Sequence, residues 1–287
     1  MATVSALVYY PVKGFAGIAL DEAEVTGTGL LDDRLLMVVS ADDGVFLSQR
    51  THPAMAAVRP APVPGGLRLA AGGTDVEIEI TPDGPRRAVS LFGHWFGEGV
   101  DQGERAAEWC SEVLGAAVRL VRVTPEHDRD GWGLHPGKVG FGDAHALLLT
   151  SESSLDSLNG RIAATGAAPV PMDRFRPNVV VTGWAEPHTE DRVRRLRVGS
   201  ATLGYSTRAI RCAVPTVDQR TGVRSGPEPV RTLAAYRREP EFGNRVSFGA
   251  KLAVLAPGAV AVGDPVTVDE WGAAVRTGSG RPPSPPA

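Results

Sequence analysis

Cysteine is scarce in this sequence, and the scarcity excludes several kinds of protein. Only Cys110 and Cys212 are cysteines among 287 residues. Two thiols do not make the disulfide framework of a small secreted protein, and they fit a reducing compartment, so we expect a cytoplasmic location. They are also too few for an iron–sulfur cluster, which usually takes about four protein ligands. Any redox chemistry of this chain therefore needs another cofactor and an external source of electrons.

Long apolar runs and a strong net charge are missing as well. No stretch of about 18 consecutive apolar residues occurs, so we expect no transmembrane helix. Residues 1–10 lack the basic start and the long apolar segment of a signal peptide. The formal net charge of −3 gives no reason to expect a nucleic acid or a membrane as a partner.

Lysine is rare, since the chain has 27 arginines but only 3 lysines. This bias can reflect genomic codon usage. It can also reflect function, because planar guanidinium groups suit the bidentate recognition of phosphate and carboxylate. Composition alone leaves both explanations open.

Several common catalytic motifs are absent. Residues 27–32 lack the third glycine of a dinucleotide-binding fingerprint and precede an expected strand, and Gly137-Lys138 is not followed by the Ser or Thr of a phosphate loop. No Gly-x-Ser-x-Gly nucleophile elbow is present. The six histidines never pair at the spacing of zinc ligands. The sequence therefore gives no support to these classes of enzyme.

Glycine and proline are abundant, with 34 and 23 residues, while aromatic residues are few. This composition favours many short strands joined by turns over long helices. Asp42-Asp43-Gly44 and Gly72-Gly73 are hairpin signals, and residues 82–85 predict another turn. The first hundred residues thus predict a small barrel or sandwich. Its expected strands are 4–12, 18–25, 34–40, 45–50, 67–71 and 76–80.

The hydrophobic period changes to that of a helix over 104–114. Trp109 and Cys110 fall on the apolar face of this helix, so we expect Cys110 in the core. Gly115 is well placed to end the helix as a C-cap.

Two more helices are expected, over 152–159 and over 229–236. Ser151 is the N-cap expected for the first of them. Residues 124–142, rich in proline, glycine and charge, are expected to form a mobile loop, and the tail 273–287 is disordered by composition. The further strands are expected at 118–123, 144–149, 178–182, 194–198, 201–205, 210–214, 246–255 and 259–268.

Local chemistry gives two interpretations of Cys212. A lone cysteine is most often a buried structural residue, here within an expected strand. Against that, Arg208 and Arg211 lie within four residues of the sulfur, and nearby positive charge favours the thiolate that binds metals or attacks electrophiles. The turn signal 218–222 would place the sulfur near a strand end. The residues alone leave both interpretations open.

Several separated segments resemble, in order and spacing, the MOSC-domain family, specifically the branch of the mitochondrial amidoxime-reducing component and its bacterial relatives. Each motif is weak by itself, but the set covers about residues 5 to 270. The segments are Tyr10-Pro11-Val12-Lys13-Gly14, 29–34 (GLLDDR), 148–155 (LLTSESSL), 175–179 (FRPNV), Arg211-Cys212 with 216–222 (TVDQRTG), 228–237 (EPVRTLAAYR) and 263–266 (GDPV).

The resemblance implies a mainly β chain with peripheral helices, of the α+β class. It implies a small N-terminal β-barrel over about 1–95 and a MOSC β-barrel domain over 96–272, with the cofactor in the cleft between them.

The resemblance also implies a molybdenum cofactor (Mo-molybdopterin) whose metal is bound by the Cys212 thiolate, a ligand type suited to a sulfur-rich site. Asp218 is a candidate catalytic carboxylate near the metal, with a structural role in its turn as the alternative. Ile210 stands where relatives often have Ser, and Gly14 replaces a frequent Ser. The implied cofactor contacts are Lys13, Gly14, Arg34, Thr150, Ser151, Arg176, Asn178, Ile210, Arg211 and Cys212.

Each of these residues has a plainer interpretation. Lys13 can be a solvated charge in a turn, Arg34 a surface residue, and Thr150 and Ser151 a helix cap.

The activity implied is the reduction of N-hydroxylated or N-oxide small molecules, with an external protein or flavin reductase as electron donor. One alternative is a sulfur-transfer protein that carries a persulfide on Cys212. Another is a non-catalytic module that binds the cofactor, and pyridoxal phosphate binding is a further association of the family.

Overall fold

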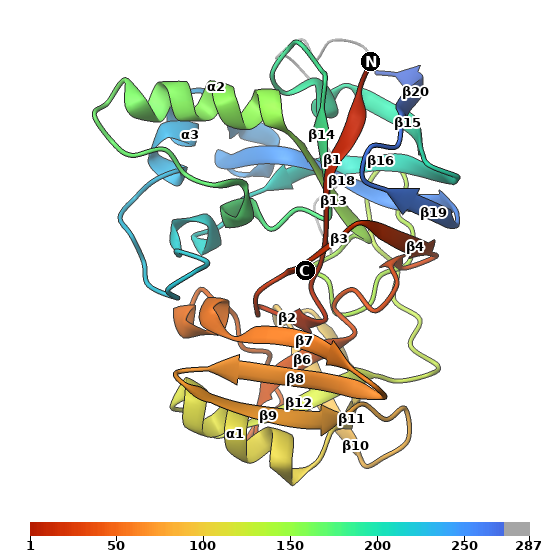
Figure 1. Cartoon of the computed structure of the whole chain (residues 1–287), viewed down its shortest axis with the longest axis vertical. Helices are drawn as coiled ribbons and strands as arrows, with labels where there is room; N and C mark the ends of the chain where they lie inside the picture. The colour runs from red at the N-terminus through yellow and green to blue at the C-terminus, as the bar shows by residue number, and fades with distance from the viewer. Residues whose placement is uncertain (273–287) are drawn as a thin grey trace.

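The computed structural model describes residues 1–272, so the tail expected at 273–287 lies outside the described residues. Two β-rich units lie one above the other along the longest axis of the molecule (Figure 1). The chain starts in the upper unit with β1 (Thr3–Tyr9) and touches the lower unit at β2 (Val12–Lys13). It then returns to the upper unit and enters the lower one again at β6 (Leu36–Ser40). The N-terminal segment is therefore shared between the two units.

A nine-stranded mixed sheet forms the centre of the upper unit. Neighbouring strands are antiparallel except for β13 and β14, which run parallel. One face of this sheet packs the core of the unit, with Leu7, Leu149, Leu196 and Leu252 among its buried side chains. The path is β20 (Val266–Trp271), β15 (Val193–Val198), β16 (Ala201–Ile210), β18 (Arg245–Ala256), β13 (Leu147–Ser151), β14 (Val179–Thr182), β1 and β3 (Ile18–Leu20), with β17 (Arg238–Glu239) paired to β18.

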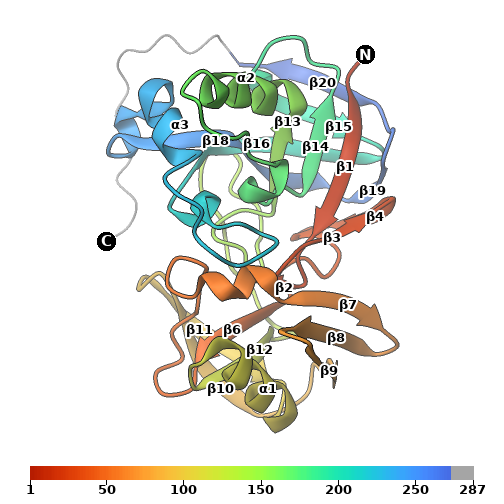
Figure 2. The same ribbon diagram turned by 60° about the vertical axis from the view of Figure 1, so that its left-hand side comes forward.

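Two helices, α2 (Glu152–Ala163) and α3 (Val230–Tyr236), pack beside this sheet around a second core, as Figure 2 also shows. Ser151 is the N-cap of α2, because its hydroxyl accepts a hydrogen bond from the backbone N–H of Ser154. A short 3-10 helix, η2 (Met172–Phe175), leads from this region to β14 and carries the buried Phe175.

The lower unit combines a five-stranded sheet, a three-stranded sheet and α1 (Glu104–Leu114). Trp109 and Cys110 of α1 are buried between the helix and the sheets, which confirms Cys110 as a core residue. Gly115 ends the helix with φ 65°, the left-handed conformation expected of a C-cap glycine. The five strands are β10 (Arg86–Leu91), β11 (Trp95–Asp101), β12 (Val118–Val123), β6 and β2, and the three are β7 (Arg59–Val63), β8 (Gly66–Ala71) and β9 (Thr74–Glu79).

A fourth, small sheet joins a segment near the start of the chain to one near the end of the described residues. It consists of β4 (Glu22–Thr26), β5 (Gly29–Leu30) and β19 (Gly258–Ala261). Residues near both ends of the described chain thus stabilise the same unit.

The mainly β class with peripheral helices is confirmed, but the expected barrels are not closed. Among residues 1–272, β20 and β3 lie at opposite ends of the nine-stranded sheet and do not pair with each other. The sheets are therefore open and mixed rather than closed barrels.

Two expected strands are wrong. Residues 45–50 make only single bridges, through Val45 and Phe46, and Leu47 still donates its backbone N–H to the carbonyl of Val38 in β6 over 2.9 Å. The pairing ends there because a turn follows, in which the backbone N–H groups of Thr51 and His52 donate to the carbonyl of Ser48. The expected strand 210–214 is not formed either, since β16 ends at Ile210 and a 3-10 helix (Val214–Thr216) containing Pro215 follows. A proline fixes φ and removes a donor, so it does not extend a paired strand.

The expected domain boundary at 95/96 falls at the start of β11, which pairs with β10 in one sheet. Helix α1 and strand β12 also pack on the lower unit. The lower unit therefore extends to Val123, while β1 and β3 to β5 belong to the upper unit.

Candidate functional site

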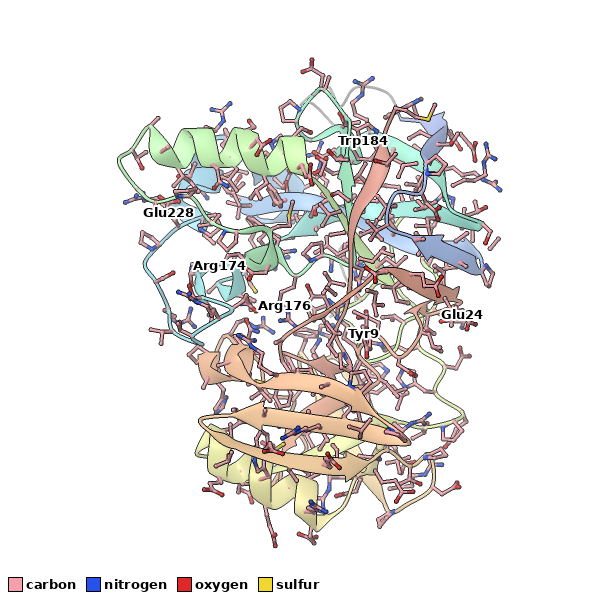
Figure 3. All side chains as sticks on the ribbon, in the orientation of Figure 1. Tyr9, Glu24, Arg174, Arg176, Trp184 and Glu228 are labelled. Carbon is pink, nitrogen blue, oxygen red and sulfur yellow. The ribbon has the colours of Figure 1, made fainter. Side chains whose placement is uncertain are left out.

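The candidate site lies where the two units meet, and Tyr10 is at its centre. Its buried ring has the Arg34 guanidinium carbon at 4.3 Å and that of Arg176 at 4.2 Å from the ring centroid. Its hydroxyl donates to the carbonyl of Pro177 over 3.1 Å. Burial raises the pKa of Tyr10 to about 12, although the two guanidinium groups oppose the shift. Figure 3 shows Arg176 between the two units.

Both of these arginines have an unusual backbone conformation. Arg34 has φ 49° and Arg176 has φ 57°, in the left-handed region that non-glycine residues rarely occupy. Such strain is kept only where the surrounding contacts enforce it, and it gathers at functional sites. The backbone N–H of Arg34 donates to the carbonyl of Tyr10 over 2.7 Å, and that of Arg176 donates to Asp173 over 3.0 Å.

Asn178 connects Arg34 to the upper sheet. Its Oδ1 accepts from Arg34 Nη1 at 2.9 Å and from the backbone N–H of Leu148 at 3.1 Å. Its Nδ2 donates to the carbonyl of Val8 at 3.1 Å. The buried Asn178 amide therefore holds Arg34 in place, and its own bonding capacity is largely used within the protein.

Further cations gather around this core of the site. Lys13 is buried and forms an ion pair with Asp143, and Arg34 forms one with Asp33. The surrounding protein atoms disfavour the charged form of the Asp143 carboxyl. The charge of Lys13 outweighs this effect and holds the pKa of Asp143 well below its usual range.

Lys251, on β18, is the least expected member of the cluster. Burial lowers the pKa of Lys251 to about 8; Asp143 raises it, and Arg211 is among the cations that lower it further. Burial also lowers the pKa of Arg176, and that of Arg129, to about 10.

The cluster holds six cations, namely Lys13, Arg34, Arg129, Arg176, Arg211 and Lys251. Four of them have no carboxylate partner. Among residues 1–272, no carboxylate oxygen lies within salt-bridge distance of their side chains. These four are Arg129, Arg176, Arg211 and Lys251. The site therefore carries excess positive charge before any ligand is added.

Cys212 lies beside this cluster. Its thiol is exposed, two residues past the end of β16, so the interpretation as a buried strand cysteine is wrong. The preceding Arg211 donates from Nη2 to the carbonyl of Phe175 at 2.8 Å, while its buried Nε has no hydrogen-bond partner within residues 1–272. The half-buried Ile210 is the last residue of β16. An accessible sulfur thus stands next to an unsatisfied buried donor.

Thr150 and Ser151 make their side-chain contacts inside the protein. Thr150 is fully buried and its hydroxyl donates to the sulfur of Met172. Ser151 caps α2 and donates to Glu190 over 2.9 Å. The hydrogen bonds of Ser151 are those of the helix-cap interpretation.

Asp218 is bound within its own turn. Its Oδ1 accepts from the backbone N–H groups of Arg220 and Thr221, each at 2.9 Å. Its Oδ2 accepts from the buried Arg174 at 3.2 Å. Both oxygens therefore have structural partners, as the turn interpretation expects.

Four residues of this region carry no direct signal in the sequence, namely Gln49, Asp143, Gln219 and Lys251. Gln49 and Gln219 are buried amides from different units that bond each other across the site. The rarity of lysine could have identified Lys251 as a candidate, because two of the chain's three lysines, Lys13 and Lys251, lie in this site.

The residues present fit the cofactor that the motifs imply. A phosphate suits a cluster with four cations that lack carboxylate partners and with the unsatisfied Nε of Arg211. An exposed thiol suits a sulfur-ligated metal. Among residues 1–272, no group of three or more His, Cys, Asp or Glu side chains gathers as a metal site, so such a metal would take its other ligands from the cofactor.

None of the helices in the described part of the chain has the length and apolar character needed to cross a membrane.

Comparison with known proteins matches two families to this chain. The MOSC N-terminal beta barrel domain matches residues 1–117, and the MOSC domain matches residues 136–267.

Curated relatives cover nearly the whole chain. Mitochondrial amidoxime-reducing component 1 of Mus musculus is 32% identical over 284 residues, which is 93% of this chain and 82% of the relative. Mitochondrial amidoxime reducing component 2 of Macaca fascicularis is 33% identical, covering 93% of this chain and 83% of the relative. The solved structure of the YUAD protein from Bacillus subtilis is 12% identical, with a TM-score of 0.38, over 92% of this chain and 93% of that one.

Proposed function

The chain belongs to the MOSC-domain family, and from this premise we propose that it binds a molybdenum cofactor through Cys212 and reduces N-hydroxylated or N-oxide small molecules. The relatives named as amidoxime-reducing components support this type of substrate. The observation that carries the proposal is the exposed Cys212 thiol beside cations that lack carboxylate partners.

In this proposal the chain's own residues divide into three roles. Cys212 holds the metal, because a soft thiolate suits a metal that is already bound by sulfur. Lys13, Arg34, Arg176 and Arg211 hold the anionic part of the cofactor through charge-assisted hydrogen bonds. Asn178 acts through Arg34, since its amide bonds that guanidinium and two backbone groups.

The proposed reaction consumes two electrons and two protons for each N–OH group, and it releases water and the N–H product. When bound, the cofactor would supply the metal centre that exchanges these electrons with the substrate. The other cysteine, Cys110, is buried in an apolar core, so it offers no accessible second thiol for electron transfer in this scheme. An external protein or flavin reductase therefore delivers the electrons in this scheme.

A sulfur-transfer role for Cys212 is the second candidate function, and the exposure of its thiol is the observation that favours it. A persulfide carrier needs an accessible sulfur but no cation cluster that reaches from Lys13 to Lys251. The extended cluster therefore favours the cofactor proposal. A non-catalytic cofactor-binding module remains an outcome of the activity assay, while pyridoxal phosphate gains no support from the described residues. A cytoplasmic location stays a prediction.

The test compares Cys212→Ala with Cys110→Ala, so that one thiol is lost in each variant. Molybdenum per protein is measured by plasma mass spectrometry, and reduction of benzamidoxime is measured with a chemical electron donor. We expect the wild type and Cys110→Ala to contain molybdenum and to reduce the substrate, and Cys212→Ala to lose turnover while it remains folded.

Full activity of Cys212→Ala with molybdenum still bound would refute the assignment. A labile extra sulfur on Cys212 in mass spectra, without molybdenum, would support sulfur transfer instead. Molybdenum and pterin in the wild type without any N-hydroxy reduction would support the non-catalytic module.

A further inference from the structure

Two buried glutamines bond each other across the boundary between the units. Gln49 Nε2 donates to Gln219 Oε1 at 3.0 Å, and Gln219 Nε2 donates back to Gln49 Oε1 at 2.8 Å. The residues are 170 positions apart in sequence and are only 2% and 6% exposed. We call this contact the amide pair.

The amide pair is fully satisfied, and its neighbours fix its orientation. Gln49 Nε2 also donates to the carbonyl of Gly14 at 2.7 Å, and Gln219 Nε2 donates to the carbonyl of Val217 at 3.1 Å. Because both neighbouring groups are acceptors, each amide nitrogen has to face them. Among residues 1–272, no atom of either amide is a buried group without a partner.

Through these bonds the amide pair reaches three parts of the candidate site. Gly14 follows Lys13 directly. Gln219 Oε1 also accepts from Arg176 Nη1 at 3.0 Å, which fixes the guanidinium above the Tyr10 ring. Gln219 itself lies in residues 211–222, which also contain Cys212 and which we call the Cys212 segment.

The Cys212 segment lies directly on the lower unit. Arg59 of β7 donates from Nη2 to the carbonyls of Gln219 and Arg220 at 2.9 and 3.0 Å. Gly222 has so little room that an added Cβ would come within 2.9 Å of the Cα of Ala54. The lower unit thus decides where the segment that carries Cys212 can lie.

We propose that Gln49 and Gln219 are positioning residues, which join the two units and set Arg176 and the Cys212 segment for cofactor binding. This inference rests on the proposed function, because it assigns the amide pair to the same site. A merely structural amide pair would stabilise the fold without any special effect on Arg176. Gln219 Oε1 accepts from both Gln49 and Arg176, so the two roles are separated by a variant that breaks the amide pair and leaves the bond to Arg176.

The test uses two substitutions in the amide pair. Gln219→Met keeps the size of the side chain but removes both the acceptor for Arg176 and the bonds to Gln49. Gln49→Met also removes the bonds between the two amides, but it leaves Gln219 Oε1 to accept from Arg176. Comparison of the two variants therefore isolates the contact with Arg176.

Gln102→Met is the matched control. Gln102 is also a buried amide, 9% exposed, and it makes three hydrogen bonds with Thr81 and Val100, all within the lower unit. Its loss removes a similar set of bonds at a distance from the site.

Three quantities are measured for each variant. They are the thermal unfolding midpoint, the molybdenum bound per protein at increasing concentrations of added cofactor, which gives the affinity, and hydrogen–deuterium exchange of residues 211–222 in cofactor-free protein. We expect Gln219→Met to lower cofactor affinity about tenfold to a hundredfold, the usual effect of losing a hydrogen bond to a charged group, and to speed exchange of the Cys212 segment. Gln49→Met should keep most of the affinity but also speed the exchange, and Gln102→Met should leave both unchanged.

The proposal is overturned if Gln219→Met and Gln102→Met lose the same amount of molybdenum for the same loss of thermal stability. It is also overturned if Gln49→Met fails to bind more molybdenum than Gln219→Met. If Gln219→Met does not fold, Gln49→Met takes its place, and unchanged exchange of residues 211–222 in that variant refutes the positioning role. The exchange measurement needs no cofactor, so its result stands even if the wild type reduces no N-hydroxy compound.

Discussion

The buried Glu190 gives a prediction whose size follows from its surroundings. Its side chain lies in a 3-10 helix (Thr189–Asp191) and is fully buried. Glu190 Oε2 accepts from the hydroxyls of Ser151 and Ser154, each at 2.9 Å, while Oε1 has no partner within residues 1–272. Burial raises the pKa of Glu190 to about 7, and the charge of Asp191 adds to the shift.

The sign of the pH effect follows from the raised pKa. Below pH 4.5 the carboxyl of Glu190 is protonated in both the folded and the unfolded chain. As the pH rises toward about 7, the unfolded chain loses this proton first, so the free energy of unfolding falls. The difference between 4.5 and about 7, at ~1.36 kcal/mol per pH unit, corresponds to ~3 kcal/mol.

Glu190→Gln removes this loss because an amide does not ionise. Any lost or unsatisfied hydrogen bond of the amide shifts stability equally at every pH. Between pH 5 and pH 8 we therefore expect the variant to gain about 2.5 kcal/mol relative to the wild type, which is roughly 4 °C in unfolding midpoint for a chain of this length.

The assay is thermal unfolding followed by circular dichroism, at pH 5 and pH 8 and constant ionic strength. Glu186→Gln, a substitution at a nearby exposed position, serves as the control. A midpoint difference between Glu190→Gln and the wild type that is the same at both pH values would refute the reasoning. The result also concerns Ser151, whose hydroxyl is donated to this carboxylate rather than to a ligand.

Three further predictions follow from the site. Phosphate binding to cofactor-free protein, measured by calorimetry, should weaken as the pH rises through about 8, where Lys251 loses its charge, and Lys251→Met should remove this dependence. Asn178→Leu should lower the free energy of unfolding in urea by about 2–4 kcal/mol, because buried backbone groups of Leu148 and Val8 lose their partners; a loss under about 1 kcal/mol would contradict this. Asp218→Asn keeps the turn acceptor, so kcat should stay within about twofold, whereas a hundredfold loss at unchanged stability would make Asp218 catalytic.

Elements governed by local chemistry could be predicted from the sequence. Helix α1 has the bounds expected from its periodicity and from Gly115, and the β8–β9 hairpin lies where Gly72-Gly73 predicts it. The N-cap role of Ser151 was equally legible. In each case the signal and the structure it forms lie within about a dozen residues.

Features that depend on distant pairing could not be predicted in this way. Residues 45–50 have strand-like composition, but β2 occupies the edge of β6 at Leu36 and Met37, and the chain turns after Ser48. Lys251 joins the site only because β18 pairs with both β13 and β16. The partner of Gln49 lies 170 residues away, and no local pattern identifies it. The placement of Lys13, Arg34 and Arg176 near one another was implied by the family motifs rather than by composition or periodicity.

Strand β1 has a consequence for how the chain acquires its structure during synthesis. Its residues pair with Val179 to Thr182 of β14, and Thr3 also bridges to Pro265. One edge of the strand can pair with β3 soon after synthesis, because β3 already begins at Ile18. The other edge waits for β14, which at about 5–20 residues per second is made roughly ten to thirty seconds later. During that time the lower unit can fold, but this edge of β1 stays unpaired. A nascent chain of this kind needs β1 to be shielded, and truncation of residues 1–9 would leave β14 as an open sheet edge prone to association.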